Sequence, residues 1–100
     1  MTSRVFIVQD LGLVNYSPCA EYGVPHVCVD KAVPLVRLSA AFTTLRKQMT
    51  GITKADWIVP TGHPALIGYA CYIQATQTGA IRLLVWDRIK KCYLPSEVQI

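Results

Sequence analysis

The sequence has 100 residues, of which 52% are apolar and 16% are charged. This composition excludes intrinsic disorder, which requires few apolar residues and many charges. The net charge of +4 is mild and falls short of the dense basic patch of a dedicated nucleic-acid-binding protein. A domain this small cannot hide many apolar side chains in its own core, so the apolar excess predicts a surface covered by a protein partner or by a second copy.

The first half of the chain predicts two strands and one helix. Residues 4–9 and 24–30 are rich in β-branched residues, and Pro25 suits the first residues of a strand or an edge strand. The loop between them, residues 11–24, is long for so small a domain. A run with helical spacing follows, for which Ser39 is the expected N-cap and Gly51 the expected stop.

The centre of the chain predicts a strand that turns directly into a helix. Residues 57–59 form a short apolar run typical of a strand buried on both faces, and Pro60 ends it because proline cannot donate to a ladder. Pro64 fits the first position of a helix, where its missing N–H is not needed. Thr61 or His63 is then the expected helix cap.

The helix that follows is expected to lie in a core or an interface, because residues 65–75 are almost wholly apolar. Thr78-Gly79 is its expected stop, and the run is too short to span a membrane. Residues 81–87 predict another strand. Strand, helix and strand within about 30 residues indicate a βαβ unit with parallel strands and a right-handed crossover.

The chain ends in a predicted β-hairpin, with a turn at residues 87–91 and a last strand at residues 92–100. Pro95 predicts that this last strand lies at a sheet edge. The order of elements predicts a single α/β domain over residues 1–100, in two or three layers. Its sheet is mixed and mostly parallel, with four or five strands and two helices.

The turn at Thr61, Gly62 and His63 is a candidate ligand-binding site, because open α/β sheets bind ligands at the carboxyl ends of their strands. Backbone N–H groups at a helix start, the Thr61 hydroxyl and the His63 imidazole can hold a small anion or a nucleotide phosphate. The simpler interpretation is a turn shaped by Gly62 and Pro64. It is favoured because Pro64 removes one donor and no glycine-rich phosphate motif is present.

The predicted hairpin is a candidate nucleic-acid or partner surface, formed by Arg82, Trp86, Arg88, Lys90, Lys91 and Tyr93. Basic and aromatic side chains together can contact phosphates and stack bases. The simpler interpretation is a solvated turn whose charges protect an edge strand from aggregation. The mild net charge favours this simpler interpretation.

The sequence has no recognisable catalytic constellation, so we expect no enzyme and no cofactor. His63 has the chemistry of a general base, and Asp10 and Asp87 lie near predicted strand ends, but both aspartates also suit ordinary turns. No nucleophile elbow and no metal triad is present. The start of the chain lacks a signal-peptide pattern, so a cytoplasmic protein with no membrane contact is expected.

The cysteines are interpreted as reduced thiols, because no secretory signal points to an oxidising compartment. A metal site is the weaker alternative, since the spacing of its potential ligands matches no common zinc module. Those ligands would be Cys19, His26, Cys28 and Cys92.

Three stretches carry a family resemblance: Arg4-Val5-Phe6-Ile7-Val8-Gln9-Asp10, Gly62-x-Pro64-x-x-Ile67-Gly68-x-Ala70, and Leu84-x-Trp86-Asp87-Arg88 followed by Tyr93-x-Pro95-x-Glu97-Val98. They resemble a group of small uncharacterised proteins of tailed-bacteriophage genomes, for which no activity is established. The position of His63 is often acidic in that group, which implies a helix-capping role. The resemblance implies a phage origin and a protein that binds another macromolecule in the infected cell.

The sequence thus predicts a small non-catalytic phage protein that acts through protein–protein contact in the host cytoplasm, by self-association or by binding a host or phage protein. The last strand and the loop at residues 11–24 are the expected contact surfaces. Nucleic-acid binding by the basic hairpin and anionic-ligand or nucleotide binding at Thr61 to Pro64 are the alternatives.

Overall fold

The computed structural model describes residues 3–12 and 15–100, which form five strands and two α-helices in one domain. Two short 3₁₀ helices, η1 and η2, lie in the connections. The elements in chain order are β1 (Arg4–Gln9), η1 (Ser17–Glu21), β2 (Val24–Val29), η2 (Leu35–Arg37), α1 (Leu38–Gln48), β3 (Trp57–Val59), α2 (Pro64–Thr78), β4 (Ala80–Asp87) and β5 (Cys92–Gln99).

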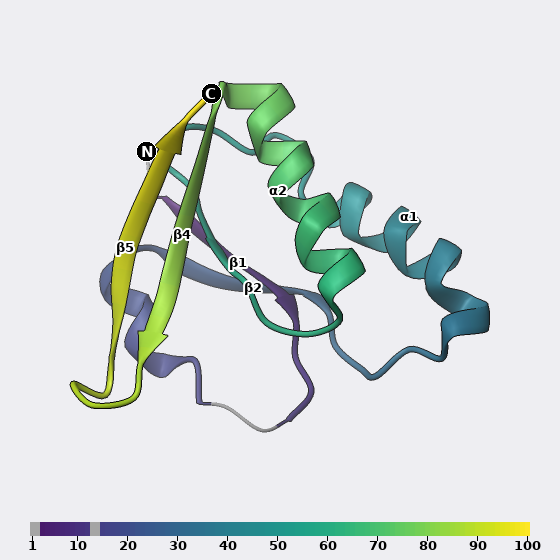
Figure 1. The fold of residues 1–100 in the computed structure, drawn as a ribbon, viewed down its shortest axis with the longest axis horizontal. Helices are drawn as coiled ribbons and strands as arrows, with labels where there is room; N and C mark the ends of the chain where they lie inside the picture. The colour runs from purple at the N-terminus through teal and green to yellow at the C-terminus, as the bar shows by residue number, and fades with distance from the viewer. Residues whose placement is uncertain (1–2, 13–14) are drawn as a thin grey trace.

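The strands form one mixed sheet in the order β2-β1-β3-β4-β5 (Figure 1). The first four strands are parallel, and β5 pairs antiparallel with β4. The predicted α/β class, the mostly parallel sheet and the C-terminal hairpin are therefore confirmed. The predicted crossover is confirmed as well, because β3 and β4 are parallel neighbours joined by α2, with Ile58 opposite Leu83.

The two faces of the sheet are covered differently. Helices α1 and α2 lie side by side on one face, where they pack on Phe6, Val8 and Ile58 (Figure 1). The other face carries Val5 and Ile7 and is covered by η1 and its flanking residues. The connection from β1 to β2 thus crosses one face and the next two connections cross the other. The change of side falls between β1 and β3, a position at which open α/β sheets bind ligands.

Helix α1 begins two residues earlier than a cap at Ser39 predicts, and it lacks that cap. Ser39 is not the N-cap but the second residue of the helix, so that prediction is wrong. The reason lies in Pro34, whose carbonyl accepts the Arg37 N–H at 2.8 Å and starts the 3₁₀ turn η2. That turn runs directly into α1, so no side chain caps the first N–H groups.

Helix α2 begins and ends as predicted, with His63 rather than Thr61 as its cap. The Nδ1 atom of His63 accepts the Ala65 N–H at 3.0 Å, and Gly79 ends the helix at φ +79°. One row of the helix is buried, and Tyr72 on another side is exposed. The third buried member of that row is the polar Gln74, which the apolar pattern gave no reason to expect.

Strand β5 lies at the sheet edge, as Pro95 predicted. The Ile100 N–H donates to the Gly79 carbonyl, so alternate residues of β5 direct their backbone groups toward β4. Pro95 occupies one of the intervening positions, whose backbone groups point away from the sheet. Its missing N–H therefore leaves no ladder bond unmade. No helix in the described part of the chain has the length and apolar character needed to cross a bilayer.

Candidate functional site

The turn between β3 and α2 is held in place by a buried glutamine from β1. Gln9 Oε1 accepts the His63 N–H at 2.8 Å, and Gln9 Nε2 donates to the Lys31 carbonyl at 2.6 Å. Thr61 joins the same contact, because its carbonyl accepts the Gln9 N–H at 3.1 Å. Anion binding would use backbone N–H groups at the start of the helix. Two of these, the N–H groups of His63 and Ala65, already donate to acceptors within the protein. Anion binding at Thr61, Gly62 and His63 stays a prediction.

The structure brings residues from the two predicted sites into one cavity. A cleft of about 450 Å³ lies beside the carboxyl ends of β3 and β4, on the face covered by η1. We call it the aromatic cleft. Its main lining residues are Asn15, Tyr16, Thr61, Leu84, Trp86 and Tyr93. The spacing of these residues along the chain does not predict that they line one cleft, because the 15–18 segment reaches the cleft by folding over the sheet.

Three aromatic side chains, those of Tyr16, Trp86 and Tyr93, line the aromatic cleft. The rings of Trp86 and Tyr93 meet edge to face with centroids 5.0 Å apart. Tyr93 is buried, whereas 39% of Trp86 is exposed. Burial raises the pKa of Tyr93 and of Tyr16, and a hydrogen bond with Thr61 partly opposes the rise at Tyr16. Both phenols are therefore neutral near neutral pH, and the phenol of Tyr93 is hydrogen-bonded to the buried Cys19 thiol.

The basic residues of the hairpin turn lie next to this aromatic pair. The β4–β5 ladder closes at the pair Asp87 and Cys92, and Arg88, Lys90 and Lys91 are exposed just beyond it. Asp87 Oδ1 accepts the N–H groups of Ile89 at 2.9 Å and Lys90 at 3.1 Å, which shapes the turn. The Asp87 carboxylate thus stabilises the hairpin turn.

Arg82 lies far from that turn, near the start of β4. Its guanidinium stacks on the ring of Trp57, with Cζ 3.7 Å from the centroid. Its Nε lies 3.1 Å from Glu97 Oε1, and its Nη1 donates to the Lys54 carbonyl. Of the residues proposed as a hairpin surface, Arg82 is the one that the structure separates from the rest. The role of these residues as a partner or nucleic-acid surface stays a prediction.

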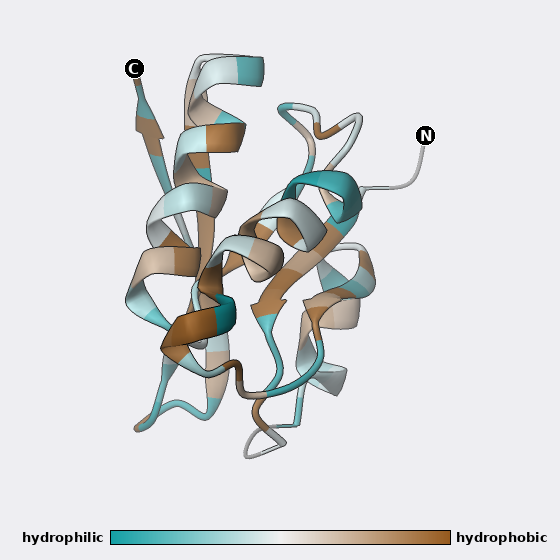
Figure 2. Cartoon of the chain, turned by 90° about the vertical axis from the view of Figure 1, so that its right-hand side faces the viewer, coloured by the Kyte–Doolittle hydropathy of each residue, from teal (hydrophilic) through white to brown (hydrophobic). Residues whose placement is uncertain are grey.

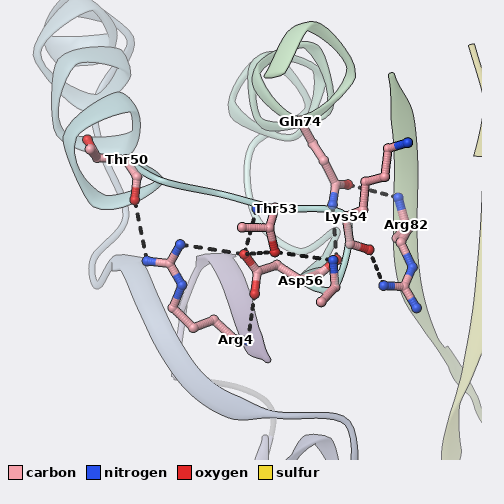
Figure 3. A network of polar contacts seen from close by, with 8 residues as sticks. Arg4, Thr50, Thr53, Lys54, Asp56, Gln74 and Arg82 are labelled. Atoms are coloured by element: carbon pink, nitrogen blue, oxygen red, sulfur yellow. Dashed lines mark hydrogen bonds and ion pairs between the residues drawn. The ribbon is translucent and has the colours of Figure 1, made fainter. Parts of the chain in front are cut away.

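A polar network at the opposite end of the sheet was missed by sequence reasoning (Figure 3). The buried Asp56 accepts the backbone N–H groups of Arg4 and Thr53, each at 2.8 Å. Gln74 donates to the Asp56 carbonyl at 3.0 Å and accepts the Arg82 N–H at 2.8 Å. These bonds join α2 to the starts of β1, β3 and β4, so the network is structural.

The outer end of the sheet presents an apolar surface on the side that carries the helices. Leu83 packs with the helices, so Val85, two residues on, faces the same side. Leu94 lies opposite Val85, and Val98 lies opposite Ile81, which places both on that side too. We call Val85, Leu94 and Val98 the β4–β5 apolar face. Figure 2 shows β5 beside α2, with hydrophobic and hydrophilic bands alternating near its C-terminal end.

The cysteines are free thiols, and burial raises the pKa of Cys28 to about 12. Among the described residues, no three His, Cys, Asp or Glu side chains gather in a way that could hold a metal ion. His26 is hydrogen-bonded to Gln48 at 2.6 Å instead.

Comparison with known proteins places the chain in a family. No curated protein and no solved structure matches it. A family model described as "Phage Pam3 gp32-like protein" matches residues 3–100, which is nearly the whole chain. The predicted resemblance to small phage proteins is therefore confirmed, and the chain belongs to the Phage Pam3 gp32-like protein family.

Proposed function

We propose that this phage protein acts without catalysis, by contact of its β4–β5 apolar face with another protein chain in the cytoplasm of the infected cell. The observation that supports the proposal is the exposure of this face. Val98 is 57% exposed, Val85 43% and Leu94 39%, and all three lie together on one side of the outer strands. Apolar side chains grouped in this way are typical of surfaces that a partner covers.

The free edge of β5 is poorly suited to pairing with an added strand, which favours a contact through the face of the strand. Pro95 has no N–H to offer at the free edge. The Tyr93 carbonyl, which also points to that edge, accepts the Tyr22 hydroxyl at 3.1 Å. An added strand would thus find the middle of β5 poorly equipped with backbone partners. A helix or sheet packed onto Leu94 and Val98 needs none of these groups.

Self-association is tested by size-exclusion chromatography with light scattering. The wild type is compared with Val98→Lys, which puts a charge in the proposed contact, and with Thr76→Lys, which puts the same charge on an exposed position of α2. We expect a dimer or larger assembly for the wild type and Thr76→Lys, and a monomer for Val98→Lys. Equal masses for all three proteins would exclude self-association through this face.

A different partner is tested with the same three proteins as baits in lysates of phage-infected cells. The proposal expects a specific protein to be retained by the wild type and Thr76→Lys and lost with Val98→Lys. If the wild type is monomeric and all three baits retain the same proteins, the β4–β5 apolar face is not a contact surface.

A further inference from the structure

The aromatic cleft lies on the other side of the sheet from the β4–β5 apolar face, because Leu84 faces the η1 side while Leu83 faces the helices. Val85 lines the cleft and also belongs to that face, whereas Leu94 and Val98 do not line the cleft. Its volume of about 450 Å³ falls within the range of small-molecule sites in proteins. It also lies beside the carboxyl ends of β3 and β4, the edge of the sheet at which open α/β sheets bind ligands.

The lining of the cleft selects a flat, uncharged ring. Tyr16, Trp86 and Tyr93 supply aromatic surface, and no side chain among its described lining residues carries a charge. The cleft also contains hydrogen-bonding groups. Thr61 and Tyr16 contribute hydroxyls, and the amide nitrogen of Asn15 is left to donate because Oδ1 accepts the Ser17 N–H at 3.0 Å. A heterocycle with donors and acceptors along its edge matches this combination.

Positive charge stands next to the cleft but not inside it. Trp86 and Tyr93 form the second-last pair of the β4–β5 ladder, one pair before the hairpin turn, and the exposed Lys90 and Lys91 belong to that turn. A ligand whose ring lies against Trp86 and whose anionic group extends toward the turn would satisfy both parts. Nucleotides have this construction, with a neutral base and a phosphate separated by a sugar.

We infer that the aromatic cleft binds the base of a nucleotide, with the phosphate directed to the cations of the hairpin turn. The same chemistry is offered by a free nucleotide and by one residue of a single-stranded nucleic acid. The inference does not rest on the proposed protein contact, since the groups that it uses, Tyr16, Thr61 and Trp86, line the cleft and are not part of the β4–β5 apolar face.

The two tryptophans allow an internal control in a single titration. In ¹⁵N-labelled protein, the indole N–H of Trp86 reports on the cleft, whereas that of Trp57 reports on a ring stacked under Arg82 at the other end of β4. Adenosine 5′-monophosphate, adenosine and ribose 5-phosphate are titrated separately. We expect a saturable shift of Trp86 and not of Trp57 with the first two probes. Ribose 5-phosphate should leave Trp86 unmoved.

Two variants separate the base contact from the phosphate contact. Tyr16→Ala should weaken binding of adenosine about fivefold or more, the usual effect of removing a ring from a base-stacking site. The double substitution Lys90→Gln and Lys91→Gln should reduce the affinity for adenosine 5′-monophosphate to that for adenosine, and leave adenosine binding unchanged. Tyr72→Ala, which removes an exposed aromatic ring of α2, should change neither.

The source of the nucleotide is distinguished by a short oligodeoxyadenylate. Binding about tenfold tighter than that of the mononucleotide assigns the cleft to a nucleic-acid strand, and equal binding assigns it to a free nucleotide. The inference is overturned if Trp86 and Trp57 shift alike, if the shifts rise without saturation, or if Tyr16→Ala binds as the wild type does.

Discussion

Gln9 and His63, which are 54 residues apart in the chain, are joined by a hydrogen bond of 2.8 Å from the His63 N–H to Gln9 Oε1. The same Gln9 side chain donates to the Lys31 carbonyl that follows β2. One buried amide therefore connects the carboxyl ends of β1, β2 and β3. This bond fixes the β3–α2 turn, and with it the Thr61 side of the aromatic cleft.

We predict that Gln9→Leu lowers the free energy of unfolding by about 1–3 kcal/mol, because it leaves the partly buried His63 N–H without an acceptor. Urea denaturation followed by circular dichroism measures the change. Gln77→Leu is the matched control, because Gln77 is exposed on α2 and its replacement should change stability by less than about 0.5 kcal/mol. Equal stability of the two variants would show that the Gln9 bonds contribute nothing.

The glycines offer a second matched pair. Gly62 has φ +108°, and a Cβ there would lie 2.4 Å from Gln9 Cβ, whereas a Cβ at Gly68 in α2 would meet nothing within 4 Å. Gly62→Ala should therefore lower the free energy of unfolding by roughly 2–4 kcal/mol through strain and overlap. Gly68→Ala should raise it by about 0.5–1 kcal/mol, since alanine is the better helix former. A mild effect at Gly62 in the same urea experiment would contradict the turn geometry.

Gln74 supplies a third prediction, at the opposite end of the sheet. Gln74→Leu keeps most of the volume but leaves the Arg82 N–H and the Asp56 carbonyl without their partner (Figure 3). Each buried group left unpaired costs about 1–3 kcal/mol, so the loss should exceed that of Gln77→Leu on the same helix by at least about 1 kcal/mol. Stability equal to that of Gln77→Leu would mean that other groups replace both bonds.

The buried thiol of Cys28 predicts a dependence on alkaline pH. Burial raises its pKa from 9.0 to about 12, so the folded protein keeps the proton that the unfolded chain releases above pH 9. The folded state then binds more protons than the unfolded state, and stability falls as the pH rises from 9 toward 12. At pH 10 this contribution is roughly 1 kcal/mol.

Cys28→Val removes the ionisable group and tests that prediction. Between pH 8 and pH 10 the variant should lose about 1 kcal/mol less stability than the wild type, as measured by urea denaturation at each pH. The absolute stability of the variant does not matter, because the comparison is between two pH values within each protein. Parallel losses in the two proteins would assign the alkaline effect to other groups, such as the buried Tyr93.

Local signals were enough to predict the elements of this fold. Pro60, Pro64 and Gly79 mark the ends of β3 and α2, and the apolar run between them makes the crossover recognisable. Ser39 is not the cap because the 3₁₀ turn that begins at Pro34 continues directly into α1.

The contacts that hold the candidate site could not be predicted in the same way. Gln9 and Gln74 look like interruptions in apolar runs, and their partners are backbone groups brought close only by the folded sheet. The aromatic cleft has the same origin. Tyr16, Thr61 and Trp86 come from three separate segments, and no spacing rule connects them.

The contact of the β4–β5 apolar face with another chain is tested most directly by site-specific photo-crosslinking in infected cells. A photoreactive residue is placed at position 98, on that face, and in a parallel strain at position 76, which is exposed on α2. We predict a discrete crosslinked protein at position 98, either a second copy or a different chain, and none at position 76. Absence of any product at position 98, or the same products at both positions, would contradict a covered β4–β5 apolar face.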